Sequence, residues 1–206
     1  MVIVIYMDYG KKSFRTYFFL YVLFNMLKCY RVINMEKITL KEFDEVYALF
    51  EKAFIPAELR PYEKMKLLFL EDEFVIYGMY QDGRIIGAII VWEFNDFVYL
   101  ENFAVDQSLR GQGLGSQILQ AIKELYPHQL LVLEVEEPID DLTKRRVAFY
   151  QRNQYVLNPY HFVQPPLRKN APKVELMYMS YPDSINVYAF DQIKKQIFRI
   201  VYQQGI

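Results

Sequence analysis

Arg110-Gly111-Gln112-Gly113-Leu114-Gly115 holds three of the eight glycines of this 206-residue chain. An apolar, strand-like run, residues 97–105, precedes these glycines, and a helix-like run, residues 116–125, follows them. Glycine lets the backbone come close to an anion. The start of a helix adds unpaired N–H groups and the positive end of the helix dipole. The pattern therefore predicts a phosphate-binding turn between a strand and a helix.

Two other phosphate loops can be compared with this one. A P-loop does not fit, because no Gly-Lys-Ser/Thr follows at the required spacing. A dinucleotide-binding loop is a closer rival, since Gly111 and Gly113 fill its first two glycine positions and Glu134 lies about 20 residues downstream. However, residues 106–110 separate these glycines from the strand, and the sequence after Tyr155 indicates two strands and a terminal helix. A nicotinamide-dependent oxidoreductase is therefore kept only as an alternative.

A third family fits the glycine loop and its context. The segment 103–115 resembles the acetyl-CoA loop of the GNAT N-acetyltransferase superfamily, whose core pattern is Arg/Gln-x-x-Gly-x-Gly/Ala. Arg110, Gly113 and Gly115 fill that pattern. A second segment, 146–155, is similar to the later helix and strand of the family. One helix and one strand separate the two motifs, as the resemblance requires.

The resemblance implies an α+β fold, with a mixed, mostly antiparallel sheet of about seven strands flanked by helices. Apolar periodicity and turn signals agree with it. They predict an antiparallel meander that leads into the glycine loop, followed by a strand at 130–135 that runs parallel to 97–105. We expect a GNAT-like domain over 35–206 and an N-terminal extension over 1–34. Strands are expected at 36–39, 74–80, 84–94, 97–105, 130–135, 155–163 and 174–181, and helices at 40–54, after Pro61, and at 116–125, 142–153 and 184–203.

The resemblance also implies which residues hold the cofactor. In the family, the strand before the loop carries a bulge and splays from its neighbour, which exposes backbone groups to the pantetheine arm. By this resemblance, the exposed strand end of this chain would be Phe103, Ala104 and Val105, and a backbone N–H near Phe103 or Ala104 would polarise the thioester carbonyl. The pyrophosphate would be held by the loop residues Arg110, Gly111, Gln112, Gly113, Gly115 and Ser116.

Two positions depart from the family pattern. Thr143 stands seven residues before Tyr150, where the family often has a cofactor-binding asparagine, and we keep it as a candidate cofactor contact. Gln154 replaces the usual glycine before the strand aromatic, which predicts a different exit from the preceding helix.

Tyr150 and Glu101 are the candidate catalytic residues. A phenol has a reference pKa of about 10, so Tyr150 can give a proton to a departing thiolate as general acid. Glu101, on the strand that leads into the loop, is the candidate general base. The structural alternative for Tyr150 is a tyrosine that only packs in the core. For Glu101 it is a carboxylate that pairs across strands or orients the substrate. Three further carboxylates could act as base or attract a cationic amine, namely Glu134, Glu136 and Glu137.

Composition excludes several classes of protein. The 24 basic and 25 acidic residues balance, so no nucleic-acid footprint is visible. The single cysteine, Cys29, excludes an internal disulfide and fits a reducing, cytoplasmic location. With only His128 and His161 besides that cysteine, we expect no zinc site and no other metal.

The first 34 residues carry an apolar run, residues 17–27, flanked by basic residues. The run is shorter than the ~20 residues of a spanning helix, and no Ala-x-Ala cleavage site follows it. Membrane-surface contact through residues 1–34 is one interpretation. We favour a second one, in which Met35 is the natural start of the domain.

We therefore expect an acetyl-CoA-dependent N-acetyltransferase that transfers acetyl to a primary amine by direct attack in a ternary complex. The acceptor would be a small molecule or a peptide, and monomer and homodimer are both open. A sensor of the same fold that binds CoA or acetyl-CoA without turnover is the main alternative.

Overall fold

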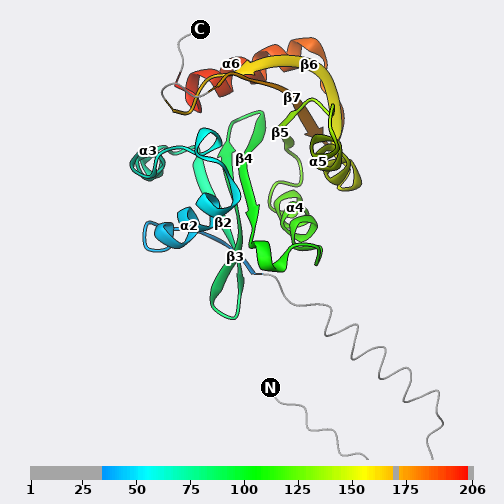
Figure 1. Cartoon of the computed structure of the whole chain (residues 1–206). Helices are drawn as coiled ribbons and strands as arrows, with labels where there is room; N and C mark the ends of the chain where they lie inside the picture. The colour runs from blue at the N-terminus through cyan, green and yellow to red at the C-terminus, as the bar shows by residue number, and fades with distance from the viewer. Residues whose placement is uncertain (1–33, 169–171, 204–206) are drawn as a thin grey trace, which may run out of the picture. The chain divides into compact units, whose positions relative to one another are not determined.

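The computed structural model describes residues 34–168 and 172–203, so the predicted N-terminal extension, apart from Asn34, lies outside the described residues. A single sheet organises them, with the strand order β1-β2-β3-β4-β5-β7-β6 (Figure 1). Among the strands of the described residues, only β4 and β5 pair in parallel, which confirms the predicted mixed sheet. The strands are β1 (Asn34–Lys37), β2 (Phe74–Gln81), β3 (Arg84–Glu93), β4 (Phe97–Val105), β5 (Leu130–Glu136), β6 (Val156–Gln164) and β7 (Val174–Tyr181).

Helices cover both faces of the sheet. Apolar side chains of α2, α3 and α6 join one core on the first face, and α4 and α5 pack on the opposite face (Figure 1). Burial of the apolar side of each amphipathic helix stabilises this arrangement. The helices are α2 (Phe43–Ala53), α3 (Tyr62–Leu67), α4 (Leu114–Leu125), α5 (Asp141–Arg152) and α6 (Val187–Ile200), with short 3₁₀ turns η1 (Pro56–Glu58), η2 (Leu68–Leu70) and η3 (Gln107–Leu109).

The β2–β3 hairpin turns at the predicted dipeptide. Asp82 and Gly83 both have positive φ, 52° and 74°, which is the backbone that a tight two-residue hairpin requires. Strand β3 then runs through the centre of the sheet and is buried from Ile85 to Trp92. Its apolar sequence is what a strand covered on both faces needs.

Strands β4 and β5 separate halfway along their length. They pair from Phe97–Leu130 to Leu100–Leu133 and no further. At the point of separation β4 bulges, because Glu101 and Asn102 together face the single residue Ile90 of β3. A bulge adds a residue and bends the strand. The expected bulge and splay are therefore confirmed, and they leave one edge of residues 101–105 without a strand partner.

The exit from α5 differs from the sequence expectation. Gln154 has φ of 68°, the left-handed backbone that glycine usually supplies after a helix. The glutamine therefore keeps the type of exit that a glycine would make, and the expected change of exit is wrong. Its side-chain oxygen accepts a hydrogen bond from Lys123 Nζ at 3.2 Å, and the same ammonium binds the Asn153 carbonyl. These bonds hold an otherwise strained residue in place.

Candidate active site

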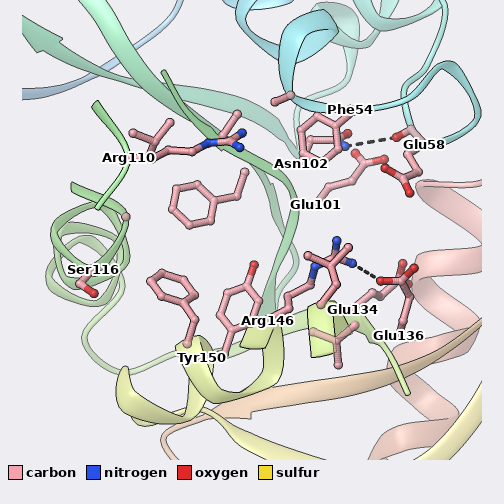
Figure 2. Close-up of a pocket in the computed structure, with 18 of the residues that line it drawn as sticks. Phe54, Glu58, Glu101, Asn102, Arg110, Ser116, Glu134, Glu136, Arg146 and Tyr150 are labelled. Carbon is pink, nitrogen blue, oxygen red and sulfur yellow. Dashed lines mark hydrogen bonds and ion pairs between the residues drawn. The ribbon is translucent and has the colours of Figure 1, made fainter. Parts of the chain in front are cut away.

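A cavity of about 780 Å³ lies where β4 and β5 separate. Its other walls are the start of α4, one side of α5, the end of α2 with η1, and parts of β6 and β7. Figure 2 shows that its two ends differ chemically. Arg110 and Ser116 lie at one end, and Tyr150 lies between the ends (Figure 2). We call the opposite end the acidic end, and its four carboxylates are Glu58, Glu101, Glu134 and Glu136.

The glycine loop presents unpaired backbone N–H groups to this cavity. Gly111 and Gly113 have φ of 80° and 78°, and Gly113 is the N-cap of α4. The first backbone bond of the helix runs from Gln117 N to Gly113 O. Within the described residues, the N–H groups of 111–116 donate to no protein acceptor. A helix start with several free N–H groups is a site for a phosphate group.

Gly115 serves a packing role. A Cβ atom at this position would lie 3.2 Å from the ring of Phe149 and 3.4 Å from that of Phe103. The absence of a side chain lets the first turn of α4 lie against the two rings, whose centroids are 6.4 Å apart. Gly115 therefore allows the first motif, residues 103–115, to pack against the second motif, residues 146–155.

Tyr150 lies on α5 and lines the cavity. Burial raises the pKa of its hydroxyl to about 12, although the nearby Arg146 lowers it. The side chain forms edge contacts with Phe149 and Tyr155, with centroids 5.2 and 5.9 Å away. The hydroxyl is thus a protonated group at neutral pH, held by aromatic packing.

Glu101 occupies the bulge of β4 and has both carboxylate oxygens engaged. Arg60 Nη2 donates to Oε1 at 2.9 Å, and Trp92 Nε1 donates to Oε2 at 2.8 Å. The Glu101 and Arg60 side chains are only 6% and 12% exposed. Both oxygens of Glu101 are therefore occupied by donors from the protein itself, an ion pair and an indole N–H, and neither is left open to a substrate proton.

Glu134 on β5 has a different environment. Tyr202, just after α6, donates its hydroxyl to Oε2 at 2.7 Å. Oε1 is buried and has no hydrogen-bond partner among the described residues. Burial raises the pKa of this carboxyl to about 7, against the lowering effect of the bond from Tyr202. A carboxyl that titrates near neutral pH is suited to take and release a proton.

Two of the candidate cofactor residues do not line the cavity. Thr143 is buried in the capping box of α5, where its hydroxyl accepts the Asp140 N–H at 3.1 Å and its own N–H binds Asp140 Oδ1. Gln112 belongs to the loop but its side chain is not in the lining. The cavity brings together all the other candidates, namely Tyr150, Glu101, Phe103, Ala104, Val105, Arg110, Gly111, Gly113, Gly115 and Ser116.

Sequence reasoning missed the residues that support the acidic end. Arg60 pairs with Glu101 and also donates to the Val201 carbonyl at 2.9 Å. Tyr202 receives a hydrogen bond from Gln164 at 2.7 Å. These side chains come from a loop, a strand and the C-terminal segment, so no local motif could have indicated them.

Comparison with known proteins places this site in a family. Residues 43–154, just over half of the chain, match the model of the acetyltransferase (GNAT) family. The chain therefore belongs to the GNAT acetyltransferase family. The sheet order and the antiparallel strands after α5 also differ from the doubly wound parallel sheet of dinucleotide-binding enzymes. The fold therefore does not support the alternative of a nicotinamide-dependent oxidoreductase.

Individual proteins resemble this chain in sequence or in fold. Bacillus subtilis (strain 168) YjbC, an acetyltransferase by name, is 33% identical over 104 residues, which are 48% of this chain and 53% of that protein. The chain thus spans about half the length of this curated relative. A Bacteroides thetaiotaomicron structure described as a GNAT-family acetyltransferase has a TM-score of 0.77 and 28% identity, covering 84% of this chain and all of that one. An Elizabethkingia anophelis GNAT structure with acetyl-CoA bound has a TM-score of 0.50 and 13% identity, covering 73% of this chain and 97% of its own.

Residues 34–168 and 172–203 contain neither a metal-ligating cluster nor a helix that could cross a membrane. No group of three or more His, Cys, Asp and Glu side chains in these ranges could hold a metal ion. No helix within them is both long enough and apolar enough to cross a membrane.

Proposed function

We propose that this protein is an acetyl-CoA-dependent N-acetyltransferase that acetylates a primary amine by direct attack in a ternary complex. One observation carries the proposal. The unpaired N–H groups of residues 111–116 open onto a cavity whose other end holds a carboxyl with a pKa of about 7. Membership of the GNAT family supports the same reaction class.

The cavity residues fit the coenzyme. The loop N–H groups at the start of α4 would hold the pyrophosphate, with Arg110 beside them. The unpartnered edge of Phe103, Ala104 and Val105 would offer backbone groups to the pantetheine amides. Acetyl-CoA supplies the acetyl group as a thioester, whose C–S bond breaks as the C–N bond to the acceptor forms.

We assign the general base to Glu134, in place of Glu101. Both oxygens of Glu101 already accept strong donors, whereas Oε1 of Glu134 has no partner among the described residues. An amine enters the site as an ammonium ion and must lose a proton before its nitrogen can attack. Glu134 takes that proton and later releases it to solvent, and its pKa near 7 favours both steps.

Tyr150 is proposed as the general acid. Its hydroxyl is protonated at neutral pH and lies between the loop end and the acidic end (Figure 2). It gives its proton to the departing sulfur, and the second proton lost by the amine nitrogen restores the phenol. Atoms and charge then balance, with one N-acetylated amine, one thiol and one proton released.

An assay of thiol release from acetyl-CoA over a panel of primary amines tests the proposal. Tyr150→Phe should lower turnover by about 10²-fold or more while the affinity for coenzyme A stays within about twofold. Tyr155→Phe is the matched control, because this neighbouring hydroxyl is buried, has no partner among the residues that the structure describes, and lies outside the cavity lining. Its turnover should be unchanged.

Two results would change the assignment. Coenzyme A binding by calorimetry with no thiol release for any amine would favour the sensor. Equal turnover of the wild type and Tyr150→Phe would remove Tyr150 from the mechanism.

A further inference from the structure

The four carboxylates of the acidic end are not equally neutralised. Arg60 pairs with Glu101, and Arg146 pairs with Glu136. Glu58 and Glu134 form no ion pair with any described residue. Burial raises the pKa of both carboxyls, and for Glu58 it outweighs the attraction of Arg146. Two carboxylates in this cavity therefore have no ion-pair partner among the described residues.

Two buried polar atoms of the cavity also lack a hydrogen-bond partner among the described residues, as the two carboxylates lack an ion pair. Two atoms that belong to cavity-lining side chains are buried without a partner among the described residues, Glu134 Oε1 and Asn102 Oδ1. Asn102 is only 6% exposed, and its Nδ2 donates to the Glu58 carbonyl at 3.3 Å. Asn102 Oδ1 is an acceptor, and so is Glu134 Oε1 whenever that carboxyl is ionised. Leaving buried acceptors unpaired is costly, so the missing group is a hydrogen-bond donor.

Charge and hydrogen bonding together define the ligand. A ligand that supplies two cations and several N–H donors satisfies this end, whereas a carboxylate-bearing amine would be repelled by it. We infer that the acceptor is an aliphatic diamine or polyamine, whose reacting nitrogen lies at Glu134 and whose second ammonium lies at Glu58 and Asn102. This inference rests on the proposed N-acetyltransferase function and narrows its substrate class.

The positions of Glu58 and Glu134 explain how the site would favour an acceptor with two ammonium groups over an acceptor with one. Asn102 follows Glu101 in the bulge of β4, and its amide ties that strand to Glu58 in η1 (Figure 2). The two unpaired carboxylates thus come from different walls of the cavity, η1 and β5. An acceptor with one ammonium can satisfy only one of them. An acceptor with two satisfies both and stays bound while one nitrogen reacts.

The test compares 1,4-diaminobutane with n-butylamine, which share one reacting amine and differ in the second. At saturating acetyl-CoA, kcat/KM for the diamine should exceed that for butylamine by about tenfold or more. Glu58→Gln should raise KM for the diamine by about tenfold and lower the ratio of kcat/KM for the diamine to kcat/KM for butylamine by a similar factor. Glu124→Gln, an exposed site on α4 outside the cavity lining, is the control and should alter neither amine.

A binding experiment gives a readout without turnover. Calorimetric titration of 1,4-diaminobutane into the protein saturated with coenzyme A should show binding that Glu58→Gln weakens by about tenfold. Equal kcat/KM for both amines, or an equal effect of Glu58→Gln on both, would overturn the diamine inference and leave the N-acetyltransferase intact. Absence of thiol release with every amine would overturn the proposed function itself.

Discussion

Glu134→Gln should make the protein more stable at neutral and alkaline pH while it abolishes acetyl transfer. Burial raises the folded-state pKa of Glu134 to about 7 from an ordinary value of 4.5. The folded protein therefore binds this proton more tightly than the unfolded chain does. The resulting contribution to stability is fully present below about pH 4.5 and is lost as pH rises through about 7.

The magnitude follows from that difference in pKa. One pKa unit corresponds to about 1.4 kcal/mol, so ionising Glu134 in the folded protein removes about 3 kcal/mol between pH 4 and pH 8. Glutamine does not ionise, and its side-chain oxygen can still accept the bond from Tyr202. The stability of Glu134→Gln relative to wild type should therefore rise by about 3 kcal/mol over the same pH range.

Urea unfolding of both proteins at intervals from pH 4 to pH 8 measures this difference. Glu124→Gln, at an exposed position, should track the wild type within about 0.5 kcal/mol at each pH. A difference between Glu134→Gln and wild type that does not change with pH would refute the argument, because it would mean that Glu134 ionises in the folded protein as in water. In the wild type, kcat/KM should rise with pH and level off above about 7 as Glu134 becomes a carboxylate.

Two further substitutions test the loop and the support of the acidic end. Gly113→Ala forces a side chain into a backbone with φ of 78°, so it should cost about 1–2 kcal/mol of stability and weaken coenzyme A binding about tenfold by calorimetry. Gly83→Ala carries similar strain at φ of 74° in the hairpin, so an equal loss of coenzyme affinity there would contradict the role of the loop. Arg60→Ala leaves Glu101 buried without its cation and should cost about 3–5 kcal/mol in urea unfolding. Recovery of part of this loss is expected when Glu101→Gln is added, and a cost below about 1 kcal/mol for Arg60→Ala would show that the pair does not stabilise the site.

The elements and the loop could be predicted because their signals are local. Asp82-Gly83 marks a hairpin turn, and Gly111 and Gly113 supply the left-handed backbone that a tight loop before a helix needs. The role of Gly115 could not be deduced in this way, because it depends on Phe149, which lies on another helix. The same is true of Gln154, whose side chain in left-handed backbone accepts a bond from Lys123 on another helix.

The choice of base shows the limit of local reasoning most clearly. Glu101 and Glu134 are both glutamates on strands beside the loop, and nothing in the adjacent sequence separates them. Arg60 and Trp92 engage the first, while the second keeps one oxygen unpartnered among the described residues.

The linear order of residues determined the family, the order of strands and helices, and the position of the glycine loop, because periodicity, turn chemistry and motif spacing act over a few residues. The tertiary structure decided which carboxylates are neutralised and which stay unpaired at the acidic end. The proton affinity of a carboxyl depends on burial and on neighbours within a few ångströms. In this protein those neighbours come from segments as far apart in the chain as Arg60 and Tyr202.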